Sequence, residues 1–180
     1  MRLIDEILVI ARQKGTGMWT SQSAMELQVP VPSIDLAVAM RGMSVFAKER
    51  GQADAIYQRS RQRFIGDRDK FLTQLCSALF AGMIILNAQG MALLTAASDK
   101  YEYNLDLEAV AWIWRAGCII RAALLEEIRA AFHARRELPN LLLARNLSRK
   151  VMEHQECLRQ VVCQAADSAT PSVTFVAWPR

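Results

Sequence analysis

The sequence predicts an all-α protein, built as a multi-helix bundle around one central buried helix. Proline and glycine are sparse, at 5 and 8 of 180 residues, and strong helix formers dominate. The composition is 52% hydrophobic and 22% charged, which is typical of a globular chain with one sizeable core. The stretch from Phe71 to Ser98 contains no charged residue. As one helix it would be apolar on nearly every face, so we expect it to be buried.

The uncharged stretch is also long enough to cross a membrane. Basic residues lie just before it, as they do at the cytoplasmic end of many spans. However, it lacks the dense Leu, Ile, Val and Phe of a span, and it includes the polar residues Gln74, Ser77, Asn87 and Gln89. We therefore predict a core helix wrapped by the rest of the chain, and no membrane partner.

The elements before this helix follow from apolar spacing, glycine and proline. The apolar pattern over 3–11 predicts a first amphipathic helix. After a tight loop, Thr20 or Ser21 is expected to cap a short helix that runs to about Gln28. Residues 29–32 are predicted to form a rigid extended connector, because a residue before proline avoids the helical region.

The next helix is expected to run from Ile34 to about Arg63, with Ser33 as its cap. Its first half is predicted to be core and its second half solvated, because charged and polar residues dominate beyond Lys48. Gly66-Asp67 is expected to break this helix before the central one.

After the central helix, Tyr101 to Asp106 is predicted to be a loop. One helix is expected from Leu105 through Gly117 to Ala134, followed by a turn at Pro139-Asn140 and a last helix from about Leu141 to Ala166. Residues 1–166 are thus expected to form one helical domain. Residues 167–180 have no helical period and are predicted to form a tail.

Charge and cysteine content narrow the classes of partner. The net charge of +4 comes from basic residues scattered among acids, so no nucleic-acid partner is expected. The four cysteines form no CxxC pair, which favours reduced thiols and a cytoplasmic location. Acidic residues interrupt the first apolar residues, so no signal peptide is expected.

The run Lys14-Gly15-Thr16-Gly17 is the first candidate binding site. It gathers a cation, a hydroxyl and flexible backbone amides, which together suit a phosphate or a carboxylate. It is neither a P-loop nor a GxGxxG dinucleotide motif. The alternative is a plain two-glycine turn.

Arg41 is the second candidate, because it is the only charge between Asp35 and Lys48. Ile34, Val38 and Val45 are expected on its face, so its guanidinium starts from a largely apolar surface. A buried arginine requires an anion. That anion is either a carboxylate elsewhere in the fold or an oxyanion of a ligand held in bidentate fashion.

Other chemistry-bearing residues predict no active site. Glu126 and Glu127 are adjacent and diverge on a helix, as do Trp112 and Trp114 on theirs. His133 is expected to be a solvated cation near a helix end. A polar helix face carries Glu153, His154, Glu156 and Cys157, but without a distant pair of ligands we expect no metal there. No catalytic residue is assigned.

Four motifs give a resemblance to a known family. The run from Lys14 to Ala24, KGTGMWTSQSA, resembles the KGTGKWTSQSA signature of decarboxylating 6-phosphogluconate dehydrogenase. Trp114 to Arg121 resembles its W-R-x-G-C-I-I-R helix. Ala88-Gln89-Gly90 resembles its Y-A-Q-G, and Asn140 to Leu143 its N-L-L-L. The motifs occur in the family's order from Leu3 to about Ala166.

The resemblance implies the all-helical C-terminal domain of an oxidoreductase family of the pentose phosphate pathway. In that family this domain builds most of a homodimer and half of the substrate site. The matching positions imply that Lys14, Thr16 and Arg41 hold the phosphate of a sugar phosphate such as 6-phosphogluconate. The family uses NADP.

The departures imply a different role for this chain. The family's nucleotide-binding domain, catalytic lysine and glutamate, and C-terminal tail have no counterpart here, Met18 replaces a lysine, and Asn87 replaces a tyrosine. We therefore expect a truncated, dimerising domain with a partial substrate site, no bound cofactor and no catalysis by itself. The alternative is one part of an NADP-dependent oxidative decarboxylase, completed by a separate nucleotide-binding chain.

Overall fold

A computed structural model describes residues 10–11, 14–57 and 64–168, and every regular element in these ranges is a helix, which confirms the all-α prediction. In chain order the elements are α1 (Thr16–Glu26), α2 (Pro32–Met43), α3 (Ala47–Tyr57), α4 (Arg68–Tyr101), α5 (Leu107–Ile113), α6 (Leu124–Ala134), the short 3₁₀ helix η2 (Leu141–Leu143) and α7 (Arg145–Asp167). Most of the predicted first helix and residues 169–180 of the predicted tail lie outside the described residues.

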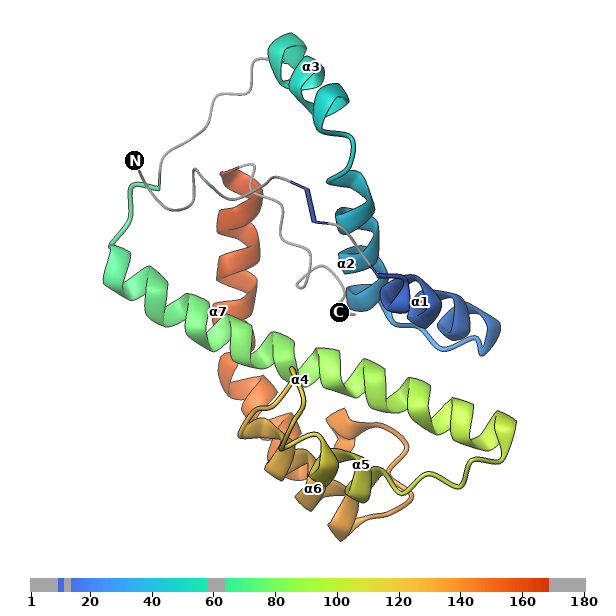
Figure 1. The fold of residues 1–180 in the computed structure, drawn as a ribbon. Helices are drawn as coiled ribbons and strands as arrows, with labels where there is room; N and C mark the ends of the chain where they lie inside the picture. Colours follow the sequence, from blue (N-terminus) through green and yellow to red (C-terminus); the bar gives the residue numbers. More distant parts are fainter. Residues whose placement is uncertain (1–9, 12–13, 58–63, 169–180) are drawn as a thin grey trace.

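The long helix α4 is the axis of the molecule (Figure 1). The helices α5, α6 and α7 gather on it and enclose the core, whose buried side chains run from Ala78 to Val161. Ile84, Met91, Leu125, Ile128 and Leu147 are among its largest fully buried residues. We refer to α4–α7 as the body.

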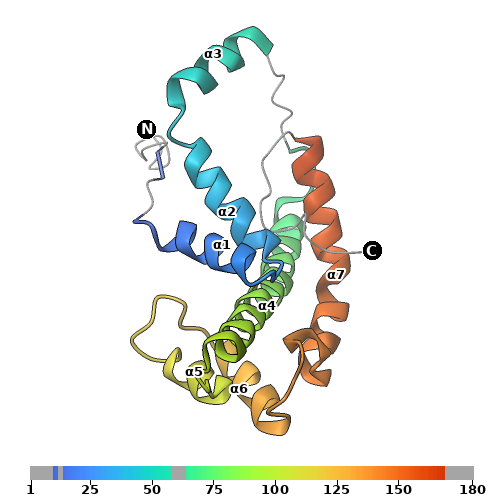
Figure 2. The ribbon, with the colours of Figure 1, turned by 90° about the vertical axis from the view of Figure 1, so that its right-hand side faces the viewer.

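The helices α1, α2 and α3 form an arm that extends away from the body (Figures 1 and 2). The helix α1 packs against α2, whereas α3 stands farthest from α4 in both views. No residue of the arm belongs to either core cluster. The described fold is therefore a helical body with a projecting arm.

The ends of α4 confirm the predicted break at Gly66-Asp67. Asp67 is the N-cap, and its carboxylate accepts hydrogen bonds from the amides of Asp69 (2.9 Å) and Lys70 (3.0 Å). The helix ends at Glu102, whose left-handed backbone (φ 55°) starts the predicted loop. The predicted turn at Pro139-Asn140 is also confirmed, since the Asn140 side chain accepts from the Leu142 amide at 2.9 Å.

The central helix contributes buried residues to the core, as predicted, but it is not covered on every face. Among the described residues α4 alone has the length and composition of a possible membrane span, and 33% of its most apolar window is buried. One row of leucines stays exposed, namely Leu72, Leu75, Leu79 and Leu86. Their spacing of three, four and seven places them on one face of α4. We call this row the leucine stripe.

Two predicted helices are each broken. The predicted helix from Ile34 to Arg63 stops at Met43 and resumes as α3; of its last residues, 58–63 are not described. Ser44 causes the break, because its hydroxyl donates to the Arg41 carbonyl at 2.7 Å and competes with the helical pattern. The predicted helix from Leu105 to Ala134 is interrupted between α5 and α6, where Gly117 has a left-handed backbone (φ 71°).

Both predicted serine and threonine caps are wrong. Thr20 and Ser21 lie inside α1, and the Thr20 hydroxyl donates to the Thr16 carbonyl at 2.8 Å. The N-cap of α1 is Gly15 instead. Ser33 lies inside α2, whose N-cap is Val31.

Candidate functional site

Lys14, Gly15 and Thr16 form the start of α1, not a loop between helices. Gly15 has φ 102°, a backbone conformation that residues with a Cβ rarely adopt, and its carbonyl accepts from the Trp19 amide at 3.0 Å. No side chain caps α1, so its first amide N–H groups have no partner within the helix. These amides and the helix dipole make this end partly positive.

The side chains at this end add to its positive character. Lys14 is exposed and brings an ammonium group, and Thr16 is exposed and brings a hydroxyl. An uncapped helix N-terminus with a cation and a hydroxyl beside it is suited to bind an anion such as a phosphate.

Arg41 lies in the last turn of α2 and is exposed. The expectation of a largely apolar, buried surrounding is therefore wrong for this chain. Ile34 and Val38 are only partly buried, and Val45 is exposed, because α2 belongs to the projecting arm and not to the core.

Hydrogen bonds connect the chain before Lys14 to the turn that carries Arg41. The Ala11 amide donates to the Ser44 hydroxyl oxygen at 2.9 Å, and this hydroxyl donates to the Arg41 carbonyl at 2.7 Å. These bonds join Ala11, three residues before Lys14 in the sequence, to the turn that carries Arg41. Lys14, Thr16 and Arg41 thus all lie on, or immediately before, the packed pair α1 and α2.

Two other motifs meet on the body. A cavity of about 340 Å³ is lined by Asn87 and Gly90 of α4 and by Trp114, Ile119 and Arg121 of the segment between α5 and α6. A larger recess of about 570 Å³ lies where α4, α5 and α6 meet. Neither lining includes Lys14, Thr16 or Arg41.

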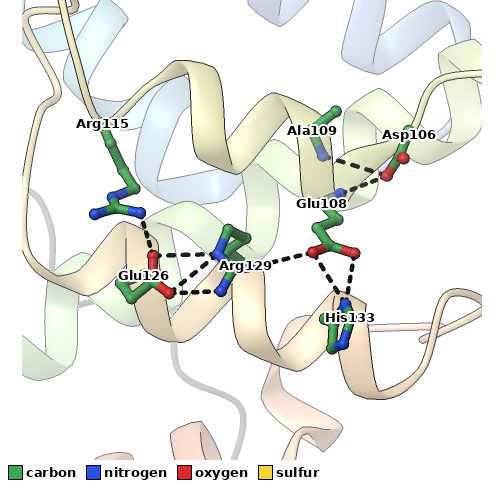
Figure 3. A network of polar contacts seen from close by, with 7 residues as sticks. All are labelled: Asp106, Glu108, Ala109, Arg115, Glu126, Arg129 and His133. Atoms are coloured by element: carbon green, nitrogen blue, oxygen red, sulfur yellow. Dashed lines mark hydrogen bonds and ion pairs between the residues drawn. The ribbon is translucent and has the colours of Figure 1, made fainter.

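A network of ion pairs joins α5, α6 and the segment between them (Figure 3). Arg129 lies at its centre and bonds to Glu126 (2.7 Å) and to Glu108 (2.8 Å). Arg115 pairs with the other side of Glu126, and His133 contacts Glu108 at 3.1 Å. The network holds the Trp114–Arg121 motif against α6.

The network shifts the ionisation of its two central groups. Hydrogen bonding from Arg129, opposed by desolvation and helped by the charge of Arg115, lowers the pKa of the Glu126 carboxyl. The same hydrogen bond to Glu126 raises the pKa of Arg129. Both effects keep the pair charged.

Sequence reasoning missed this network, although it contained a signal. Glu126, Arg129 and His133 are spaced by three and four residues, so they share one face of a helix. Their partner Glu108 could not be identified from the sequence. A single helix was predicted from Leu105 to Ala134, whereas the chain turns back after α5 and so brings α5 beside α6. The network is built of paired charges and serves to hold elements together.

The remaining candidate residues form no further site among the described residues. Trp112 is exposed while Trp114 packs on the core, which confirms that they point to different faces. The ring of His154 packs edge-on against Phe80 at 5.4 Å, and Glu156 pairs with Arg159. Within the described ranges no group of three His, Cys, Asp or Glu side chains is placed to hold a metal ion.

Comparison with known proteins accounts for the four motifs. A sequence model of the family "6-phosphogluconate dehydrogenase, C-terminal domain" matches residues 1–178. The decarboxylating 6-phosphogluconate dehydrogenase of Synechocystis sp. is 41% identical over 163 residues, which cover 91% of this chain and 34% of the relative. That of Lactococcus lactis subsp. cremoris is 40% identical over 173 residues, which cover 96% of this chain and 37% of the relative.

The fold agrees with that of a solved relative. Plasmodium falciparum 6-phosphogluconate dehydrogenase, solved in its apo form, with its cofactor NADP+ and with its substrate 6-phosphogluconate, matches with a TM-score of 0.91 and 34% identity. The match covers 96% of this chain and 38% of that protein, so the chain spans between a third and two fifths of the length of these relatives. The chain thus belongs to the 6-phosphogluconate dehydrogenase family and corresponds to part of its C-terminal helical domain.

Proposed function

We propose that this chain is a dimerising helical domain with half of a binding site for a sugar phosphate, and that it performs no catalysis by itself. The observation that carries the proposal is the uncapped N-terminus of α1, with Lys14 and Thr16 beside it. It is supported by the bonds that join Ala11, three residues before Lys14, through Ser44 to the turn of Arg41. In this proposal residues 1–166 form the helical domain, residues 167–180 form a tail, and the protein acts in the cytoplasm.

Each group of the half-site has a distinct role toward a phosphate. The Lys14 ammonium supplies charge, while the Thr16 hydroxyl and the first amides of α1 donate hydrogen bonds to phosphate oxygens. The Arg41 guanidinium has the geometry to donate two parallel bonds to one phosphate. We propose 6-phosphogluconate as the ligand, because the Plasmodium relative is described with this substrate.

The residues of this chain do not fit NADP. A dinucleotide site of the common type needs a strand, a glycine-rich turn and a helix, whereas all described elements are helical and the sequence holds no GxGxxG. We therefore propose no cofactor and no hydride transfer for this chain alone. Reduction of NADP+ by the purified chain with 6-phosphogluconate, above a blank without protein, would contradict this part of the proposal.

The exposed apolar surface supports a homodimer. The leucine stripe and the arm residues Trp19, Phe46 and Tyr57 leave large apolar side chains in water, and burying them against a second copy would be favourable. A membrane is the less favoured cover, because the body already packs α5, α6 and α7 on other faces of α4.

The alternative is a subunit of an NADP-dependent oxidative decarboxylase. The presence of Lys14, Thr16 and Arg41 supports it, since a half-site is useful when a separate nucleotide-binding chain completes it. Activity restored by co-expression with such a chain would establish this alternative, and its absence would leave the non-catalytic domain.

Thermal unfolding with 6-phosphogluconate, compared with gluconate, tests the binding proposal. A ligand at about 100 times its dissociation constant adds about 2.7 kcal/mol, which raises the melting temperature by roughly 5–10 °C for a chain of this size. We expect the rise with 6-phosphogluconate only, and we expect Arg41→Ala to remove it. Arg149→Ala is the control, because Arg149 is an exposed arginine on α7. Equal shifts with both sugars, or none, would overturn the half-site.

A further inference from the structure

The start of α2 is capped by a side chain from another helix. Val31, the N-cap residue, has no hydrogen-bonding side chain, and Pro32 has no N–H, so the Ser33 amide is the first donor of α2 that needs a partner. That amide donates to the Gln89 side-chain oxygen at 3.1 Å. In return, the Gln89 side-chain nitrogen donates to the Ser33 hydroxyl oxygen at 3.0 Å.

This pair is buried enough to matter. Ser33 is 2% exposed and is the one buried polar residue within the described part of the chain. Its amide and hydroxyl cannot turn to water if Gln89 is removed, and an unpaired buried donor is costly. The beginning of α2 is therefore held to the middle of α4 across 56 residues of sequence.

Both bonds to Ser33 need a side-chain amide that reaches as far as that of Gln89, because one bond uses the amide oxygen and the other uses the amide nitrogen. Methionine has a similar length and provides neither strong acceptor nor donor. Glutamate keeps the acceptor for the Ser33 amide, and its second oxygen can accept from the Ser33 hydroxyl, which rotates to donate. The two replacements thus separate loss of the pair from its conservative repair.

The pair sets the position of the anion half-site relative to the body. Arg41 follows Ser33 by eight residues on the same rigid helix, and α1, which starts at Thr16, packs against α2. The core clusters contain no arm residue, although Ala24 and Val31 of the arm are buried outside them, so the Ser33–Gln89 pair is a directed polar link between the arm and the body.

We propose that Gln89 is a positioning residue for the sugar-phosphate half-site, which it holds in place by capping α2 through Ser33. This inference rests on the proposed function for its ligand, but its geometric part does not. The proposed cap links the glutamine of the Ala88-Gln89-Gly90 motif, which lies on the body, to the position of the binding residues on the arm.

The test compares Gln89→Met, Gln89→Glu and the control Asn87→Leu in the full chain. Asn87 is matched because it is an amide two residues away on α4, and its side chain donates to Met83 of its own helix. Binding of 6-phosphogluconate is titrated at a temperature where urea curves show every variant to be folded. We expect about fivefold weaker binding for Gln89→Met, recovery of most of the affinity in Gln89→Glu, and no change in Asn87→Leu.

Two results would overturn the proposal: unchanged binding by Gln89→Met, or an equal loss in Gln89→Met and Asn87→Leu. If Gln89 had only a general structural role, both replacements would lower the stability of the chain. They would then not differ from each other in their affinity for 6-phosphogluconate.

Amide hydrogen exchange gives a readout that needs no ligand. We expect Gln89→Met to speed exchange in α1 and α2 on the order of tenfold and to leave the core amides of α6 and α7 unchanged. If the wild-type chain binds no 6-phosphogluconate, the proposed function fails, and this experiment still decides the role of Gln89. Unchanged exchange in the arm would show that Gln89 does not position it.

Discussion

Glu126 and Glu127 are consecutive on α6, yet they hold different parts of the body together. Glu126 receives bonds from Arg129 and pairs with Arg115, whereas Glu127 accepts from the Lys150 ammonium of α7 at 2.8 Å. The prediction that these carboxylates diverge is confirmed. One of them fixes the segment after α5, and the other fixes α7.

The lowered pKa of Glu126 predicts a pH dependence of stability. Because folding favours the charged form, the stabilisation is complete above the ordinary value near 4.5 and is lost as the pH falls through the folded pKa. The free energies of unfolding of wild type and Glu126→Gln, measured with urea, should therefore differ by a constant amount above about pH 5 and by less below it. The effect is modest, because the side chain is 43% exposed. A difference that does not vary with pH would contradict this assignment.

Gly15 is predicted to be intolerant of a side chain, unlike Gly90. Alanine at Gly15 must adopt φ 102°, which we expect to cost about 1–2 kcal/mol and to lower the melting temperature by roughly 2–8 °C. Gly90 lies inside α4 with open space where a Cβ would be, so Gly90→Ala should stabilise by about 0.5–1 kcal/mol. Calorimetry of the two variants checks the opposite signs, and equal shifts would refute the argument.

Gln28 offers a stabilising substitution. It ends α1 in a left-handed conformation (φ 55°), with the Gln28 amide bonded to the Met25 carbonyl and the Val29 amide to the Ala24 carbonyl. Glycine adopts this conformation without strain, so Gln28→Gly should gain about 0.5–1 kcal/mol after its larger chain entropy is subtracted. Urea unfolding measures the gain; a loss of stability would show that the Gln28 side chain contributes more than its strain costs.

The leucine stripe is the predicted core of the dimer interface. Leu79 is 54% exposed at its centre, so Leu79→Lys should leave the fold intact while placing like charges opposite each other in the dimer. The molar mass that light scattering measures at micromolar concentration should then fall from that of a dimer to the 20.2 kDa of one chain. Met152→Lys, at an exposed position on α7, is the control. A wild-type monomer, or a dimer that survives Leu79→Lys, would reject the stripe.

The amino-acid composition was enough to predict the fold class, and residues that favour caps and turns were enough to predict several helix boundaries. Asp67 and Asn140 act as caps or turns because their short side chains bond to nearby amides, a local effect that is visible in sequence. The central position of the Phe71–Ser98 stretch also followed from its lack of charge.

The break at Ser44 and the capping of α2 by Gln89 could not be predicted, because both involve groups distant in sequence, whereas Gly117 is a local signal for the other break that the single predicted helix passed over. Ser44 interrupts the helix while bonded to Ala11, 33 residues away, and Ser33 is bonded to Gln89 instead of capping its own helix. The exposure of Arg41 follows from the arm lying outside the core, a tertiary fact that no local pattern carries. The predicted roles of Lys14, Thr16 and Arg41 stay predictions.

The division into arm and body has a consequence for proteolysis. All buried core clusters lie in α4–α7, so the arm opens at lower free energy than the body, and α3, which contains no buried residue, should open most readily. A protease should therefore cut first near α3 and leave a resistant fragment that begins close to α4. A phosphate ester bound across α1 and α2 should slow later cuts within those two helices and leave the first cut in α3 unchanged, so the lifetime of the α1–α2 segment would report how much of the site is occupied.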